Sequence, residues 1–201
     1  MNSKALKARQ DFELLLQHIN SVQRKGTTLL IGIDGCGGSG KSTLAANLKE
    51  RLPNATVVHK DDFYLPASQI LKMDPKDKPI GADFDGERFL KQVLVPLSQN
   101  KEGHYHRYDW DLDALAEWHT IPAGGTVIIE GVYSLRKEFF DCYDCTIWVE
   151  CPRDIRLARG LERDGEAARD RWVKNWMVSE DVYMDMYKPF LKADLLVSGI
   201  E

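Results

Sequence analysis

Long hydrophobic runs are missing from the sequence, since none approaches the roughly 20 apolar residues that a membrane-spanning helix needs. Charge of one sign is also scarce, because 27 basic and 31 acidic side chains leave a formal net charge of −4. That balance indicates neither a nucleic-acid groove nor a polybasic membrane patch. The first residues lead into a polar segment that lacks the apolar core of a signal peptide. We therefore expect a cytoplasmic protein without nucleic-acid or membrane partners, and the sequence leaves a homo-oligomer open.

Cysteine is also sparse, with four residues in 201, and the spacing gives little sign of a metal centre. Cys142 and Cys145 have the C-x-x-C spacing, but no second pair lies at the distance that a zinc site requires. Because aromatic and apolar residues surround them, we interpret both as small core side chains in a reducing compartment. The cysteines therefore do not suggest a metal or redox function.

The hydrophobic residues that are present, 43% of the chain, are enough for one ordinary domain with a substantial core. Short apolar runs without alternation, typical of strands that are covered on both faces, occur at 28–33, 56–58, 126–129, 146–149 and 195–197. Helical periodicity marks 12–19, 42–52, 87–97, an arginine-rich segment after Pro152 and a long segment from Trp172 to Phe190. Strands alternating with helices predict an α/β fold, with a five-stranded parallel sheet sandwiched between helices. We expect one domain over 1–201, with an N-terminal helix within 1–25 and an irregular excursion at 66–86.

One glycine-rich segment carries the clearest chemical signal. The phosphate-binding pattern G-x-x-x-x-G-K-[ST] is matched by Gly35, Cys36, Gly37, Gly38, Ser39, Gly40, Lys41 and Ser42. Backbone N–H groups can wrap a phosphate only where side chains do not obstruct it, and the dipole of the following helix favours an anion. The sequence therefore predicts a P-loop NTPase fold. We expect this segment and Thr43 to bind ATP, with Lys41 at the β- and γ-phosphates and Ser42 on Mg²⁺.

Acidic residues follow the second and third predicted strands, at the edge where parallel sheets bind ligands. Asp61 and Asp62 come directly after the second strand, and Glu130 ends the third. A kinase that acts on a hydroxyl needs a carboxylate to accept its proton, and we assign this role to Asp61. The alternative is that these aspartates only cap the following turn. Glu130 closes an apolar strand where a P-loop protein keeps a carboxylate for magnesium, so we expect it to hold Mg²⁺ directly or through water.

An arginine-rich helix follows the fourth predicted strand. Arg156, Arg159 and Arg163 are spaced by three and four residues, so they share one helix face. Guanidinium groups suit the charge of a transferring phosphoryl group, and we expect a helical arginine lid over 152–170. We assign Arg159 and Arg163 to catalysis together with Lys41, and Arg156 to ATP binding. A solvated basic face is the alternative.

Together these segments resemble the uridine kinase / phosphoribulokinase family of P-loop kinases. The similarity covers about 28–199 and is carried by Asp61-Asp62-Phe63-Tyr64, Phe84-Asp85, Tyr108-Asp109, Glu130-Gly131, Arg156-Leu157-Ala158-Arg159 and Ala193-Asp194-Leu195-Leu196-Val197. The resemblance implies that Asp61 is the catalytic base, that Asp85 binds ribose hydroxyls and that Glu130 helps to hold magnesium. It also implies that Tyr108 lies near a nucleobase. The acceptor residues that we expect are Asp61, Tyr64, Asp85, Arg107 and Tyr108.

The expected reaction moves the γ-phosphoryl group of ATP to a hydroxyl of a nucleoside, first of all the 5′-hydroxyl of uridine or cytidine. The segment 47–66 is as similar to nicotinamide riboside kinases, so nicotinamide riboside, pantothenate and a sugar phosphate stay open as acceptors. A nucleotide-dependent switch is the alternative outside the enzymes. A GTPase would need a guanine-specifying segment such as N-K-x-D, which does not follow the third strand.

Overall fold

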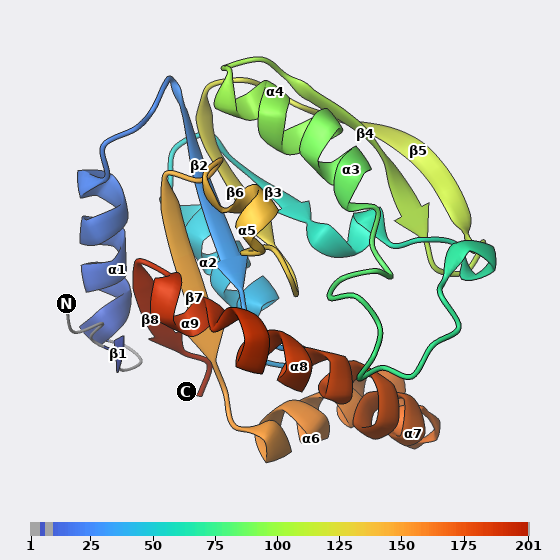
Figure 1. The fold of residues 1–201 in the computed structure, drawn as a ribbon. Helices are drawn as coiled ribbons and strands as arrows, with labels where there is room; N and C mark the ends of the chain where they lie inside the picture. The colour runs from blue at the N-terminus through green and yellow to red at the C-terminus, as the bar shows by residue number, and fades with distance from the viewer. Residues whose placement is uncertain (1–4, 7–9, 201) are drawn as a thin grey trace.

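Six parallel strands form the central sheet of the computed structural model, which describes residues 5–6 and 10–200 (Figure 1). Across the sheet the order is β1 (Ala5–Leu6), β8 (Leu195–Ser198), β7 (Cys145–Glu150), β2 (Thr28–Asp34), β6 (Gly125–Glu130) and β3 (Ala55–His59). Each neighbouring pair is parallel. The five predicted strands are confirmed, and the short β1 is added at the edge beside β8.

Helices connect the strands and cover both faces of the sheet. In chain order they are α1 (Gln10–Ser21), α2 (Lys41–Arg51), η1 (Lys60–Phe63), η2 (Ala67–Gln69), α3 (Gly86–Phe89), η3 (Leu90–Leu94), α4 (Val95–Ser98), α5 (Lys137–Phe140), α6 (Arg153–Asp164), η4 (Glu166–Ala168), α7 (Arg169–Arg171), η5 (Trp172–Trp176), α8 (Met177–Tyr187) and α9 (Pro189–Lys192). The helix predicted at 87–97 is the continuous run α3, η3 and α4, in which η3 is π-helical.

The single long helix predicted from Trp172 to Phe190 is wrong at its C-terminal end. It runs as η5 and α8 and ends at Tyr187, because Lys188 adopts a left-handed conformation with φ 47°. Pro189 has no N–H to continue the helix and instead begins α9.

Alternate residues of β2 show how the two faces of the sheet are covered. Leu29, Ile31 and Ile33 lie in one buried cluster together with apolar side chains of α1 and α2. Leu30 lies in a second cluster with side chains of the α3–α4 run, α5 and α8. Strands that are covered on both faces can be apolar throughout, which explains the runs in the sequence. The predicted sandwich is confirmed.

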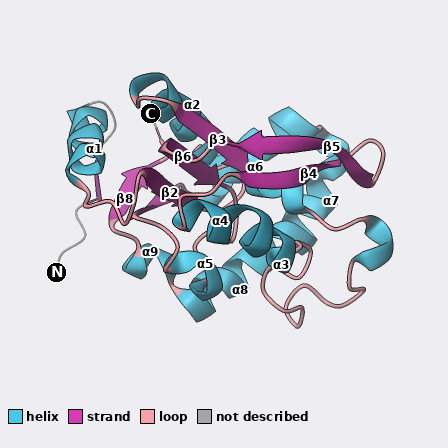
Figure 2. Ribbon diagram, turned by 90° about the horizontal axis from the view of Figure 1, so that it is seen from above, coloured by secondary structure: helices cyan, strands magenta, loops and turns pink. Residues whose placement is uncertain are grey.

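An antiparallel hairpin, which the sequence did not lead us to expect, stands apart from the sheet. It consists of β4 (Gly103–Asp109) and β5 (Ala114–Ile121) and lies on the side of the molecule away from α1 (Figures 1 and 2). Tyr105 and Ile121 are buried in the core, whereas Trp118 is exposed. The hairpin therefore packs one side on the domain and exposes the other.

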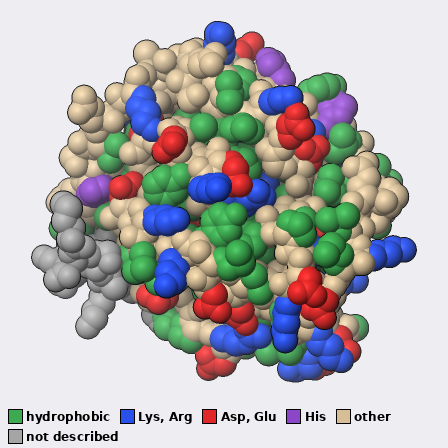
Figure 3. Space-filling view, in the orientation of Figure 1, with side chains coloured by type: hydrophobic (Ala, Val, Ile, Leu, Met, Phe, Trp, Pro, Cys, Tyr) green, Lys and Arg blue, Asp and Glu red, His purple; other side chains and the backbone are tan. Residues whose placement is uncertain are grey.

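The carboxyl ends of β2, β3 and β6 meet at the edge of the sheet that faces α6, α7 and α8 (Figure 1). Ligands of open parallel sheets bind at this edge. Over the face drawn in Figure 3, hydrophobic, acidic and basic side chains are intermixed. Within 5–6 and 10–200, no helix has the length and apolarity that crossing a membrane requires.

Candidate active site

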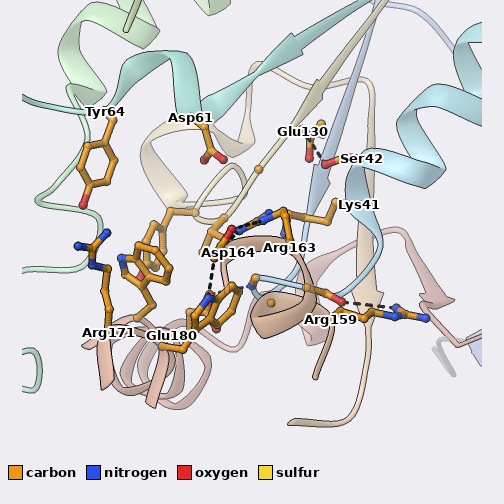
Figure 4. A pocket seen from close by; sticks show the side chains of 18 of the residues that line it. Lys41, Ser42, Asp61, Tyr64, Glu130, Arg159, Arg163, Asp164, Arg171 and Glu180 are labelled. Carbon is orange, nitrogen blue, oxygen red and sulfur yellow. Dashed lines mark hydrogen bonds and ion pairs between the residues drawn. The ribbon is translucent and has the colours of Figure 1, made fainter. Parts of the chain in front are cut away.

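A cavity of about 720 Å³ opens at the carboxyl edge of the sheet, and Figure 4 shows side chains that converge on it. Many of the residues assigned from the sequence line this cavity: Gly37, Gly38, Gly40, Lys41, Ser42, Thr43, Asp61, Tyr64, Glu130, Arg159 and Arg163. The other assigned residues lie outside its lining: Gly35, Cys36, Ser39, Asp85, Arg107, Tyr108 and Arg156. The structure thus brings the predicted phosphate, metal and base residues together, and it separates them from most of the predicted acceptor residues.

The glycine loop connects β2 to α2, as its motif predicts. Gly40 precedes α2 and, in the part of the chain that the structure describes, no side chain caps the helix, so the first N–H groups of α2 are available to an anion. Lys41 begins the helix, is buried, and donates from Nζ to the Cys36 carbonyl oxygen at 3.0 Å. The loop therefore has the N–H groups and the ammonium group that a nucleotide phosphate needs.

A buried carboxylate anchors the start of the loop. Asp34 accepts hydrogen bonds from the backbone N–H groups of Gly35, Tyr133 and Leu135 at 2.7, 3.1 and 2.8 Å. It also accepts one from the Tyr183 hydroxyl at 2.7 Å. Burial raises the pKa of Asp34 to about 6, although each of these hydrogen bonds favours the charged form. Asp34 ties the loop to the segment after β6 and to α8.

A second buried carboxylate, Glu180 of α8, holds the middle of the loop. One of its oxygens accepts from the Gly37 N–H at 2.7 Å, and the other pairs with Arg156 of α6 at 2.8 Å. Both side chains of the pair are 4% exposed, and burial raises the pKa of Glu180. Arg156 also donates to the Cys151 carbonyl oxygen. In this arrangement Arg156 supports the loop through Glu180 rather than facing the cavity.

Two further arginines of α6, Arg159 and Arg163, line the cavity. Arg159 donates to the carbonyl oxygens of Gly199 and Gly38 at 2.8 and 3.4 Å, so it joins the loop to the segment that follows β8. These segments are in close contact, because a Cβ built on Gly199 would lie 1.9 Å from the Ser39 carbonyl oxygen. Arg163 is paired with the neighbouring Asp164 at 2.7 Å. Its guanidinium group points into the cavity beneath Asp61 in Figure 4.

An oxygen-rich pair lies where α2 meets the end of β6. The Ser42 hydroxyl donates to a Glu130 carboxylate oxygen at 3.2 Å, and His59 Nδ1 lies 2.6 Å from the same oxygen. Burial opposes ionisation of Glu130, but the His59 hydrogen bond and the Lys41 charge leave its pKa below the usual value. The pKa of His59 is raised by the same hydrogen bond. A hydroxyl beside an ionised carboxylate fits Mg²⁺, which prefers hard oxygen ligands.

Asp61 lies in η1, directly after β3, and its carboxylate is open to the cavity (Figure 4). The Asp61 side chain is exposed toward the cavity, and desolvation by the cavity walls, followed by the charge of Glu130, raises the pKa of Asp61. Asp62 points elsewhere and accepts from the Tyr105 hydroxyl at 2.8 Å. The two neighbouring carboxylates are therefore distinct, and only Asp61 lines the cavity.

Aromatic side chains line the end of the cavity away from the glycine loop. The rings of Tyr64 and Trp110 have centroids 4.4 Å apart, and Phe84 lies 5.1 Å from Tyr64. Trp176 of η5 also lines the cavity, as does Arg171 of α7, whose guanidinium group lies 5.7 Å from the Trp176 ring. This end offers flat apolar surfaces with polar edges.

The predicted acceptor residues outside the cavity have partners of their own. Asp85 caps α3 by accepting from the Arg88 N–H at 2.9 Å. Arg107 binds Glu117 and Asp109 on the hairpin, each at 2.7 Å. The Tyr108 hydroxyl donates to Asp113 at 2.6 Å, while its ring packs 5.8 Å from that of Tyr64. Tyr108 thus packs against the aromatic end of the cavity without lining the cavity itself.

Sequence reasoning missed several residues that line the cavity, namely Asp83, Trp110, Arg171, Trp172, Trp176 and Glu180. Trp172 and Trp176 stood out only as members of a helical pattern. Both tryptophans lie in the chain just after the arginine-rich helix, and that position was the available signal.

A parallel sheet with a glycine phosphate loop, a serine–glutamate pair and an acidic residue facing the same cavity defines a P-loop kinase. Within that class, the chain belongs to the phosphoribulokinase / uridine kinase family, whose family model matches residues 30–195.

Individual relatives agree with this assignment. The chain is 24% identical over 194 residues to uridine-cytidine kinase C of Dictyostelium discoideum, in an alignment covering 94% of this chain and 42% of the relative. It is 32% identical over 146 residues to a uridine kinase of Alkaliphilus metalliredigens, covering 69% of each. A solved structure described as a possible uridine kinase from Bacillus stearothermophilus aligns with a TM-score of 0.74 and 22% identity. That alignment covers 92% of this chain and 96% of the other, and it supports the fold.

Proposed function

We propose that the protein transfers the γ-phosphoryl group of ATP to the 5′-hydroxyl of a nucleoside such as uridine or cytidine. The observation that carries this proposal is one cavity that joins Lys41 and Ser42 of the glycine loop, Asp61, and the aromatic pair Tyr64 and Trp110. The Asp61 carboxylate thus lies between the phosphate site of the glycine loop and the flat apolar surface of the aromatic pair. The relatives named uridine kinase and uridine-cytidine kinase favour the same acceptor.

The donor end would bind ATP through the glycine loop and the start of α2. Lys41 would place its charge at the β- and γ-phosphates, and Arg159 and Arg163 would lie over the transferring group. Mg²⁺, when bound, neutralises charge on the phosphates, and Ser42 and Glu130 would hold it. These residues contribute positioning and electrostatic stabilisation, which supply most of the catalysis in phosphoryl transfer.

The acceptor end would hold the nucleoside base against Tyr64 and Trp110. In the transfer step the hydroxyl oxygen forms a bond to the γ-phosphorus, the bond to the leaving ADP oxygen breaks, and the hydroxyl proton passes to the Asp61 carboxylate. The raised pKa of Asp61 brings this base closer to neutral pH, where proton transfer is most effective.

A coupled ADP-release assay against a panel of acceptors tests the proposal. The panel contains uridine, cytidine, other nucleosides, nicotinamide riboside, pantothenate and small sugars, each with ATP and Mg²⁺. We expect ADP release that depends on uridine or cytidine and a 5′-monophosphate product identified by mass spectrometry. ADP release without any acceptor would favour a nucleotide-dependent switch, and release only with a different acceptor would keep the kinase but replace the substrate.

The proposal involves small molecules alone as partners, with no nucleic acid or membrane, and it places the protein in the cytoplasm. Size-exclusion chromatography with light scattering would determine whether copies of the chain associate. The cavity is lined by residues of one chain, so the proposed reaction does not depend on the answer.

A further inference from the structure

We propose that Lys60 is a positioning residue for phosphoryl transfer, whose buried ammonium group holds the turn that carries Asp61 and places a positive charge behind the Asp61 carboxylate. The inference rests on the proposed role of Asp61 as the base. Lys60 directly precedes Asp61, follows β3 and begins η1. Its side chain is 1% exposed, so its charge acts entirely inside the protein.

Four phenylalanine rings enclose the ammonium group. Nζ of Lys60 lies 4.5 Å from the ring centroid of Phe84, 4.8 Å from Phe89, 5.7 Å from Phe139 and 5.9 Å from Phe63. The rings come from η1, from the loop before α3, from α3 and from α5. Ring faces attract cations, more strongly where water is excluded. Segments distant in the chain therefore fix the position of one lysine.

The Cβ of Lys60 is packed as tightly as its ammonium group. A Cβ built on Gly131 would lie 2.4 Å from the Lys60 Cβ, so only glycine fits after Glu130 at this point. Gly131 also has a φ of 149°, which side chains rarely allow. The turn that carries Asp61 consequently rests against the end of β6, where Glu130 meets Ser42. Moving Lys60 would shift Asp61 relative to the metal pair.

Two carboxylates, Asp61 and Asp85, act on the buried charge of Lys60. The charged groups that face Lys60 are Asp61 of its own turn, Asp85 and Arg88 at the start of α3, and Arg136 before α5. Asp85 is paired with Arg88 at 3.5 Å, and within 5–6 and 10–200 Asp61 makes no ion pair. Burial, followed by the charge of Arg136, lowers the pKa of Lys60 to about 7. The positive charges that lower the pKa of Asp61 are those of Lys41 of α2, Lys60 of its own turn and Arg163 of α6.

Replacing the charge while keeping the shape tests this inference. Methionine has a similar length and suits an aromatic cage, so Lys60→Met should fold with a free energy of unfolding at least equal to wild type. Losing a nearby positive charge should raise the pKa of Asp61 by about one unit. We would measure it from the pH dependence of the Asp61 side-chain ¹³C resonance, assigned by its loss in Asp61→Asn. The acid limb of the kcat/KM pH profile should move to higher pH by the same amount.

Lys91→Met is the matched control, because Lys91 is exposed and its ion pair is with Glu87, one turn earlier in the same helical run. It should leave the Asp61 titration unmoved. Lys60→Gln provides a second neutral variant. An unchanged Asp61 pKa in both Lys60 variants overturns the proposal, and so does failure of both to fold, which would make Lys60 a structural residue. A wild-type protein that is inactive on every acceptor would refute the proposed function alone, because the resonance titrates without turnover.

Discussion

The two ends of the cavity are built in different ways. At the donor end, buried charges fix the glycine loop: Asp34 accepts four hydrogen bonds, and the Glu180–Arg156 pair is 4% exposed on both sides. At the acceptor end, the ring of Tyr64 rests on Trp110, which is 51% exposed. A buried network of charges has one geometry in which all of its hydrogen bonds are made, whereas stacked aromatic rings can slide past one another and stay in contact. We therefore expect the geometry of the phosphate site to be fixed and the geometry of the acceptor site to be adjustable.

Asp61 lies between the two ends, and Asp61→Asn should have the largest effect. The variant keeps the size of the side chain but removes the anionic proton acceptor, so kcat should fall by about 10²–10⁴. The KM for ATP should stay within a few-fold, since the glycine loop follows a different strand. Steady-state kinetics with both substrates varied would measure this. The matched control is Asp62→Asn, which should turn over nearly normally, and a larger loss there would move the base by one residue.

Lys41→Ala should damage the donor end alone. Removing the ammonium group that the loop directs at the phosphates should lower kcat by about 10²–10³. The circular dichroism spectrum and the acceptor KM should remain close to wild type. Lys49→Ala, at an exposed position on the same helix, provides the control. Normal kcat in Lys41→Ala would contradict the assignment of the loop.

Glu180→Gln should show that the donor end depends on buried charge. The change leaves Arg156 without its partner in the interior, which costs about 3–5 kcal/mol of unfolding free energy. Urea denaturation would measure the loss. Asp181→Asn removes the neighbouring pair with Arg153, both 45% exposed, and should cost at most about 1 kcal/mol. Equal losses of unfolding free energy in the two variants would mean that burial does not make the Glu180–Arg156 pair more important for stability than the exposed pair.

Trp110→Ala should affect the acceptor end and leave the donor end intact. Stacking of a base on an aromatic ring is worth about 1–3 kcal/mol, so the acceptor KM should rise by about tenfold while the KM for ATP stays constant. Trp118→Ala on the hairpin is the control, because Trp118 is 63% exposed and lies outside the cavity. A change in the KM for ATP with Trp110→Ala would refute the division between the two ends.

Asp85 gives the smallest expected effect and separates two roles. Asp85→Ala removes the cap of α3 and should lower the free energy of unfolding by about 1 kcal/mol, whereas Asp85→Asn keeps a capping oxygen. If Asp85 also binds the acceptor, as the family resemblance implies, both variants should raise the acceptor KM. An acceptor KM that stays at the wild-type value in both would leave Asp85 as a cap only.

The donor end could be predicted from the sequence because its motif is contiguous. The loop from Gly35 to Ser42 is one stretch, and the apolar run before it predicts the strand that presents it. Asp61 and Glu130 were predictable for a related reason, since each closes a strand and parallel strands end at one edge of the sheet.

The acceptor end depends on contacts that no local pattern encodes. Trp110 reaches the cavity because the hairpin packs beside η1, and the strands of that hairpin mix histidine, arginine and tyrosine rather than alternating cleanly. The burial of Lys60 could not be predicted either, because lysine is rarely buried and the rings that enclose it are far apart in the chain.

The contact between Gly199 and the Ser39 carbonyl oxygen has a consequence for biosynthesis. The glycine loop emerges early from the ribosome, but Tyr183, Glu180 and Gly199, which hold it in shape, are translated long afterwards. Domains fold as units, and here the nucleotide site itself must await the final strand of the sheet. A nascent chain that is halted before α8 would carry the whole phosphate motif and yet not retain nucleotide. Competence to bind ATP would therefore report that translation of the domain is complete.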